Sequence, residues 1–318
     1  MTMVAVTGST GEIGGRVAVR LARIGLPQRL IVRDPSSAPQ LPGASVYQVS
    51  SYGELAGMGR ALSGVDTLFL VSAHDVMAKI RESEERGVPT PYYDRLHQHI
   101  AAVSAAGAVG VRLVVYLSFL NSAPDATFIL AREHFLTEQF IRSTGIAFTF
   151  LRQGLYMDKV PEHVMNDDVI RAPAGEGRAA WTARDDIADV AVAVLTGNDH
   201  DGKTYDVTGP EALTMRETAE LLSEAIGRRI SYEALTPHEA RTQRNMSRMV
   251  NLETSRRAST GKGITEPELE GWISHYLQIA TGEAGTVSDV VPRLTGHPAQ
   301  TLADYLKNHP ESYRHLLG

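Results

Sequence analysis

Short apolar runs alternate with segments of helical periodicity through the first half of the chain. Ile13, Val17, Leu21 and Ile24, for example, share one side of a helix over residues 12–24. The runs that we predict to be strands are residues 3–7, 29–32, 45–49, 67–71, 113–117 and 147–151, and the predicted helices are 12–24, 55–62, 93–106 and 133–142. Apolar strands that alternate with helices are typical of a parallel sheet covered on both faces. The pattern predicts an α/β fold, a Rossmann-type doubly wound parallel sheet.

The regular alternation of predicted strands and helices ends after residue 152. A Gly- and Pro-rich loop covers residues 171–177, and the chain from residue 236 on is predicted to be mostly helical. We therefore expect a sheet domain over residues 1–152 and a smaller, mainly helical C-terminal lobe over 153–318. Part of the second region, about residues 181–208, is expected to return to the sheet.

Local signals mark further elements in this region. Thr214 and Glu217 have the spacing of a capping box, which predicts that a helix begins there and runs to residue 226. A helix is also predicted over 185–195, and a strand over 203–207.

The composition narrows the class of protein. The 318 residues include 31 Lys and Arg against 37 Asp and Glu, a formal net charge of −6, which argues against nucleic acid as a partner because phosphate binding needs a basic surface. No apolar run approaches the ~20 residues of a membrane helix, so we expect no membrane partner. The absence of cysteine excludes disulfides and thiolate catalysis, and a cytoplasmic location is predicted. His238-Glu239 lacks the second His of a zinc motif, so no metal is expected.

A glycine pattern joins the first predicted strand to the first predicted helix. Gly8, Gly11 and Gly14 form GxxGxxG, a variant of the dinucleotide-binding fingerprint. The first glycine allows a tight turn, the second lets backbone N–H groups approach a pyrophosphate, and the third lets the helix pack closely on the strand. The sequence therefore predicts that residues 1–152 are an NAD(P)-binding Rossmann domain.

The end of the second predicted strand bears on the choice of cofactor. NAD sites carry a carboxylate there for the ribose 2′-OH, whereas NADP sites carry an arginine for the 2′-phosphate. Arg33 is followed by Asp34 at this point. Arg33 favours NADP(H), and Asp34 keeps NAD(H) open as the alternative.

Several segments together resemble the NmrA-like family of atypical short-chain dehydrogenases/reductases, a family that includes quinone and dye reductases. The segments that carry the resemblance are residues 8–14, 33–35, 64–72, 133–138, 151–156 and 294–302. The resemblance implies roles for individual positions. The residues expected to line the cofactor are Gly8, Ser9, Thr10, Gly11, Glu12, Ile13, Gly14, Arg33, Ser72, Ala73 and Gly154.

The proton donor of ordinary short-chain dehydrogenases is missing. These enzymes use a Tyr-x-x-x-Lys pair, but none of the 11 tyrosines here has a lysine four residues later. By position, Leu130 stands in the place of that tyrosine and His134 in the place of that lysine. Ser118 matches the usual catalytic serine, and the resemblance places Tyr156 at the substrate pocket. We predict Ser118, His134 and Tyr156 as catalytic residues that supply hydrogen bonds.

Two functions remain open. An electron-poor ring can take a hydride directly and delocalise the charge, so the missing pair favours an NADPH-dependent reductase of a quinone-like or other aromatic small molecule. The alternative is a non-catalytic NADP(H)-binding redox sensor that acts through a protein partner, and a homodimer is also possible. Two further segments are candidate functional features: the long connection 73–91 and the Arg-rich stretch 241–257.

Overall fold

Seven parallel strands form one sheet in the computed structural model, which describes residues 2–72, 94–243 and 266–317. In spatial order the strands are β3 (Ala44–Gln48), β2 (Gln28–Val32), β1 (Val4–Thr7), β4 (Thr67–Leu70), β5 (Leu113–Phe119), β6 (Ala147–Gln153) and β9 (Lys203–Val207). Every neighbouring pair is parallel. This is the predicted Rossmann-type fold.

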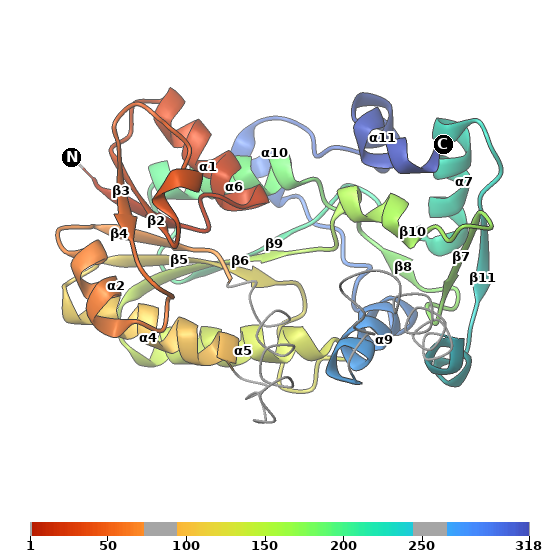
Figure 1. Cartoon of the computed structure of the whole chain (residues 1–318), viewed down its shortest axis with the longest axis horizontal. Helices are drawn as coiled ribbons and strands as arrows, with labels where there is room; N and C mark the ends of the chain where they lie inside the picture. Colours follow the sequence, from red (N-terminus) through yellow and green to blue (C-terminus); the bar gives the residue numbers. More distant parts are fainter. Residues whose placement is uncertain (1, 73–93, 244–265, 318) are drawn as a thin grey trace, which may run out of the picture.

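Helices cover both faces of this sheet (Figure 1). One face carries α1 (Glu12–Arg23), α6 (Arg184–Thr196) and α10 (Val290–Thr295), and the other carries α2 (Leu55–Leu62), α4 (Asp94–Ala108) and α5 (Ile129–Ser143). Because successive side chains of a strand point to opposite faces, Val115 joins the core under α1 and α6, whereas Tyr116 joins the core under α2, α4 and α5.

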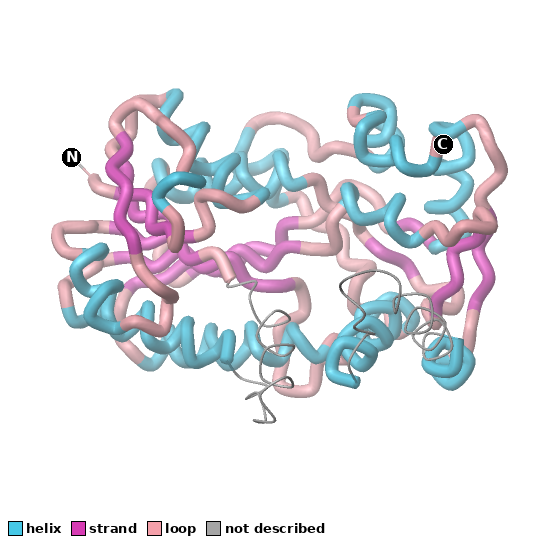
Figure 2. Tube along the Cα trace, viewed as in Figure 1, coloured by secondary structure: helices cyan, strands magenta, loops and turns pink. Residues whose placement is uncertain are grey.

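The C-terminal part of the chain builds a lobe beyond the carboxyl ends of the strands. Two short two-stranded sheets lie there (Figure 2). The elements of the lobe are β7 (Val169–Ala172), β8 (Arg178–Ala179), β10 (Leu213–Thr214), β11 (Ser231–Ala234), α7 (Met215–Ile226), α9 (Glu266–Ala280), α11 (Leu302–Asn308) and the 3-10 helices Met157–His163 and Pro310–Leu316. Another 3-10 helix, Pro35–Ser37, follows β2 in the sheet domain. The division at residue 152 stays a prediction.

The end of β5 joins the apolar core of the lobe. Phe119, at the end of β5, belongs to the same buried cluster as Trp181 and Tyr276 of the lobe. The chain therefore packs the lobe directly onto the edge of the sheet where the strands end. In Rossmann-type folds, ligands bind at this edge.

Two elements illustrate how well local signals mark boundaries. Thr214 and Glu217 form the predicted capping box, with both reciprocal hydrogen bonds present, and α7 begins directly after Thr214. Helix α5 instead begins at Ile129, four residues before the predicted start at Glu133. Its N-cap is Phe128, which makes no side-chain cap hydrogen bond, so the sequence offered no capping signal there.

Candidate active site

The turn after β1 requires glycine at two positions. Gly8 has φ +61°, a left-handed conformation that favours glycine, and its carbonyl oxygen accepts a hydrogen bond from the N–H of Gly11 at 2.9 Å. A Cβ atom on Gly14 would lie 2.3 Å from the carbonyl oxygen of Gly8 and 2.7 Å from that of Thr7. No side chain fits at Gly14, so helix α1 can run directly against the end of β1.

The order of the strands places this turn at the switch point of the sheet. The chain runs from β1 to β2 and β3 on one side, then crosses to β4 on the other, so the carboxyl ends of β1 and β4 border the crevice in which such folds bind ligands. Thr7 links the two strand ends. Its hydroxyl donates to the carbonyl oxygen of Phe69 at 3.1 Å and accepts from the N–H of Val71 at 2.8 Å.

Two buried hydroxyls at this point have no hydrogen-bond partner among the described residues. They are the Oγ atoms of Ser9, which is 1% exposed, and of Ser72, at the end of β4. Helix α1 has Gly11 at its N-cap and no side-chain cap, so its first N–H groups and its dipole are available to an anion. Unpartnered hydroxyls beside an uncapped helix N-terminus fit the pyrophosphate and ribose of a dinucleotide.

The remaining residues of the turn differ in exposure. Ile13 is buried in the core beneath α1, whereas Thr10 and Glu12 are exposed. The carboxylate of Glu12 pairs with the guanidinium of Arg16 at 2.5 Å. Ala73 lies outside the described residues.

The two residues after β2, Arg33 and Asp34, bear on the choice between NADP(H) and NAD(H). Arg33 is exposed at the end of the strand. The carboxylate of Asp34 accepts hydrogen bonds from the N–H of Ser36 at 2.9 Å and from its hydroxyl at 2.8 Å, and these bonds lower the pKa of Asp34. Asp34 therefore caps the 3-10 helix that follows, which is the local role expected of an Asp before Pro35.

Ser118 belongs to a buried ionic network. Its hydroxyl donates to Oε1 of Glu138 at 2.6 Å, and both residues are fully buried. The two carboxylate oxygens of Glu138 also accept from Nε and Nη2 of Arg152, at 2.9 and 2.7 Å. The bidentate bond raises the pKa of Arg152. The network ties α5 to the ends of β5 and β6.

His134 lies four residues before Glu138 on α5 and belongs to a second buried cluster. The hydroxyl of Tyr116 lies 2.7 Å from Nδ1 of His134, and Nδ1 of His99 lies 3.0 Å from the hydroxyl of Thr137. Burial, with a smaller contribution from Arg95, lowers the pKa of His134 well below its usual range. The same causes lower the pKa of His99 to about 3. Both imidazoles are therefore neutral at neutral pH.

A carboxylate adjoins this cluster. Oε2 of Glu133 lies 3.5 Å from Nε of Arg95, and neither atom has a hydrogen-bond partner among the described residues. Burial raises the pKa of Glu133. Glu133, Tyr116 and His99 are not among the site residues predicted from the sequence. The only feature of the sequence that could have identified these residues is that each is a polar residue on the buried side of a largely apolar strand or helix.

Tyr156 and Gly154 lie where β6 gives way to the lobe. A Cβ on Gly154 would lie 2.7 Å from the hydroxyl oxygen of Thr182, so close packing of two chain segments explains the glycine. The guanidinium of Arg184 lies 3.7 Å from the ring centroid of Tyr156, and Arg184 also pairs with Asp158 at 2.7 Å. Burial raises the pKa of Tyr156 to about 12, so its phenol is neutral. No described contact joins Tyr156 to Ser118 or His134.

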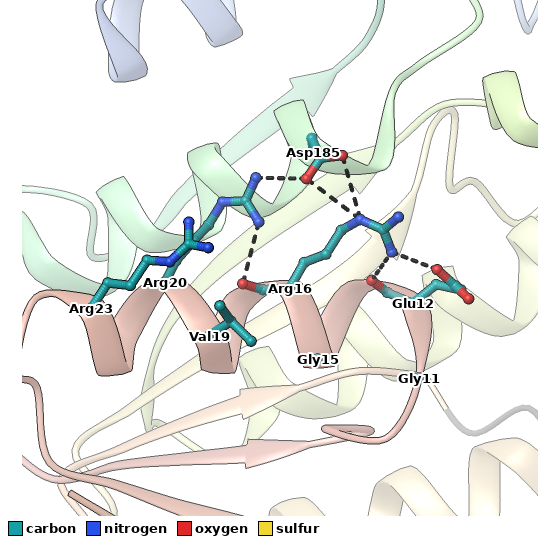
Figure 3. Close-up of a pocket in the computed structure, with 8 residues that line it drawn as sticks. All are labelled: Gly11, Glu12, Gly15, Arg16, Val19, Arg20, Arg23 and Asp185. Carbon is teal, nitrogen blue, oxygen red and sulfur yellow. Dashed lines mark hydrogen bonds and ion pairs between the residues drawn. The ribbon is translucent and has the colours of Figure 1, made fainter. Parts of the chain in front are cut away.

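A shallow groove of about 390 Å³ follows the outer side of α1 (Figure 3). Arg20 bonds Asp185 at 2.6 Å and Asp189 at 2.7 Å, and these bonds fasten α1 to α6. The lining residues are Gly11, Glu12, Gly15, Arg16, Val19, Arg20, Arg23 and Asp185. None of them is a predicted catalytic residue, but Gly11 and Glu12 are predicted cofactor residues, so the groove adjoins the glycine turn and not the predicted catalytic side chains.

Two segments that the sequence marked as candidate functional features lie wholly or mostly outside the described residues. The connection 73–91 lies outside the described residues, as does most of the stretch 241–257. Arg241, the start of that stretch, pairs with Glu266 and Glu270 of α9. Within the described ranges no three His, Asp or Glu side chains group as a metal site would require, and no helix there has the length and apolar character to cross a membrane.

Comparisons with known proteins place this geometry in a family. The chain is 34% identical over 316 residues to a (4-alkanoyl-5-oxo-2,5-dihydrofuran-3-yl)methyl phosphate reductase of Streptomyces griseus, covering 98% of this chain and 99% of the relative. It is 30% identical over 315 residues to an NAD(P)H azoreductase of Xenophilus azovorans, with the same coverage of 98% and 99%.

Among solved structures, an NADPH-dependent quinone oxidoreductase of Escherichia coli in complex with NADPH superposes with a TM-score of 0.77 at 27% identity. The alignment covers 96% of this chain and 99% of that one. The family model described as the NmrA-like family matches residues 1–267. The chain belongs to the NmrA-like family.

Proposed function

We propose that the protein is an NADPH-dependent reductase that transfers a hydride to an electron-poor, conjugated small molecule. The observation that carries the proposal is the turn between β1 and α1. Three features together suit a dinucleotide: the close approach at Gly14, the uncapped N-terminus of α1, and the hydroxyls of Ser9 and Ser72, which have no partner within the described ranges.

The cofactor residues of this proposal follow from their places around the turn. Backbone N–H groups of residues 8–14 would hold the pyrophosphate, Ser9 and Ser72 would donate hydrogen bonds, and Arg33 would bind the 2′-phosphate. Asp34 caps the following 3-10 helix through Ser36. This local role accounts for the carboxylate without a ribose hydroxyl, which supports NADP(H) over NAD(H). The bound cofactor would supply the hydride, a step for which the protein contributes position and electrostatics.

The named activities of the relatives suggest the substrate class. The names of these relatives point to a butenolide phosphate, an azo compound and a quinone as substrates. Each of these contains an unsaturated bond that can accept a hydride. Such an acceptor spreads negative charge as it takes the hydride, so a strong acid is not required. This agrees with the absence of a Tyr-x-x-x-Lys pair.

We assign hydrogen-bonding roles to the three predicted catalytic residues. With Nδ1 of His134 taken by Tyr116, Nε2 is the ring nitrogen left for an acceptor. The neutral phenol of Tyr156 can donate its hydroxyl proton in a hydrogen bond to the substrate. Ser118 donates its own proton to Glu138, so it would contribute lone pairs and hold α5 in place.

The test is NADPH oxidation, followed through nicotinamide absorbance, against a panel of quinones, azo dyes and conjugated enones, with NADH in parallel. Oxidation that depends on the acceptor, and is faster with NADPH, is the expected result. Tight NADPH binding by calorimetry without turnover of any acceptor would overturn the reductase and favour the redox sensor that acts through a protein partner.

A further inference from the structure

A row of aromatic rings leads from the candidate active site into the lobe. Phe119, at the end of β5, lies 6.1 Å from the ring of His134 and 5.0 Å from the ring of Phe128. Phe128 meets His275 of α9 edge-on at 5.7 Å, and His275 lies 6.0 Å from His163. The row thus connects a predicted catalytic residue to two histidines that the proposed chemistry does not use.

His163 is held so that one ring nitrogen stays unsatisfied. Its Nδ1 lies 2.6 Å from the hydroxyl of Tyr276, and its ring lies 5.9 Å from that of Trp181. A phenol that donates to Nδ1 leaves the ring proton on Nε2. Nε2 is buried and has no hydrogen-bond partner among the described residues.

The facing helix has unsatisfied nitrogens as well. Nε2 of His275 is buried and has no hydrogen-bond partner in the described part of the chain. The same holds for the side-chain nitrogen of Gln278, a residue that is 2% exposed. Because residues three apart share one side of a helix, Gln278 continues the side of α9 that carries His275. Buried polar atoms nearly always have partners in folded proteins. Three such nitrogens in one neighbourhood therefore point to a ligand.

These nitrogens can act as neutral donors. Burial lowers the pKa of His163 to about 3, with smaller contributions from His275 and Lys159, and burial lowers the pKa of His275 to about 4. The amide nitrogen of Gln278 is a donor in every protonation state. Apolar walls with a few polar groups are the usual composition of a small-molecule pocket.

We propose that His163, His275 and Gln278 form a subsite for an oxygen-rich substituent, a sulfonate or a phosphate ester, on the part of the substrate remote from the hydride-accepting atoms. The inference rests on the proposed function, because it assumes that the acceptor lies along the ring row. It predicts that the protein prefers acidic aromatic acceptors to neutral ones of the same ring system.

The test compares naphthoquinone with naphthoquinone sulfonate in the presence of saturating NADPH. His275→Phe keeps a ring against Phe128 but removes the nitrogens, and Gln278→Met removes the amide at similar volume. Each is expected to raise KM for the sulfonate about tenfold, as for one lost hydrogen bond to a charged group. KM for naphthoquinone and kcat for both substrates should change less than about twofold, and the exposed His315→Phe serves as the control.

Equal losses for the two quinones in both variants, or no loss for the sulfonate, would overturn the subsite. Binding of naphthalene sulfonate, which accepts no hydride, to the NADPH-loaded protein separates this proposal from the reductase itself. Calorimetry should detect binding to the wild type that weakens about tenfold in both variants, even if no acceptor is turned over. Failure of the wild type to bind this compound would also overturn the subsite and leave the reductase proposal standing.

Discussion

The hydroxyl of Tyr116 lies 2.7 Å from Nδ1 of His134, and both side chains are buried. The two residues come from β5 and α5, and they meet where the sheet packs against that helix. The sequence comparison predicts that His134 takes the place of the lysine of short-chain dehydrogenases. On that prediction, a neutral imidazole in contact with a phenol would replace a cation.

Replacing Tyr116 with Phe tests this arrangement. The variant keeps the ring that packs against Phe150 at 6.3 Å but leaves Nδ1 of His134 without its partner. We expect the free energy of unfolding to fall by about 1–3 kcal/mol, the cost of one unsatisfied buried polar group. Urea unfolding measures it. Tyr47→Phe, at an exposed tyrosine, is the matched control, and losses of the same size in both variants would contradict the role of the Tyr116 hydroxyl.

The network of Glu138, Arg152 and Ser118 gives a second prediction. Glu138→Gln removes a fully buried charge that two partners share. We expect a loss of about 3–5 kcal/mol, because breaking one side of a buried ion pair leaves the other charge uncompensated. Asp201→Asn breaks the exposed pair with Arg112 and should cost less than about 1 kcal/mol. Comparable losses in the two variants would show that the Glu138 network is not a buried ion pair in solution.

Four histidines of the described residues make the stability depend on pH. Burial lowers the pKa of His99 and His163 to about 3 and that of His275 to about 4, and it also lowers the pKa of His134. The unfolded chain takes up these protons below about pH 6.5, whereas the folded chain does not. The stabilisation is thus fully present above about pH 6.5 and is lost as the pH falls toward the folded pKa values.

Each such histidine contributes a slope of up to about 1.4 kcal/mol per pH unit between its two pKa values. Burial raises the pKa of Asp186 and Asp206, which opposes part of this loss. We expect urea unfolding of His99→Gln to show a shallower fall in free energy between about pH 6 and pH 4.5 than the wild type. His315→Gln, at an exposed histidine, should retain the wild-type slope, and an unchanged slope in His99→Gln would mean that His99 titrates normally.

The glycine turn was predictable from sequence because its cause is local. Gly8, Gly11 and Gly14 lie within seven residues, and backbone geometry alone requires glycine at Gly8 and Gly14. The capping box of Thr214 and Glu217 was predictable for the same reason. The contact of Tyr116 with His134 was not, because it depends on how α5 packs on β5. Gly154 was assigned to the cofactor by resemblance, while its contact with Thr182 depends on the path of the lobe.

Gly14→Ala follows directly from the turn. The added Cβ would lie 2.3 Å from the carbonyl oxygen of Gly8, so the backbone of the turn must move and NADPH binding should be lost. Gly59→Ala in α2 meets only Val109 Cγ1 at 4.0 Å and should gain about 0.5–1 kcal/mol from helix propensity. Calorimetric titration with NADPH and thermal unfolding of both variants check this, and wild-type affinity in Gly14→Ala would contradict a cofactor site at this turn.

Arg33 is the residue predicted to set the cofactor preference. If its guanidinium binds the 2′-phosphate, Arg33→Ala should weaken NADPH by about 1–3 kcal/mol, as for a charge-assisted hydrogen bond, and leave NADH nearly unchanged. Arg23→Ala removes a charge of the same sign from the far end of α1. It is the control for the effect of net charge on the affinity for the cofactors. Calorimetric Kd values for both cofactors give the comparison. Because Asp34 is hydrogen-bonded to Ser36, we expect Arg33→Ala to bind NADH no more tightly than the wild type does. Equal losses of affinity for NADPH and NADH would show that Arg33 does not distinguish the two cofactors.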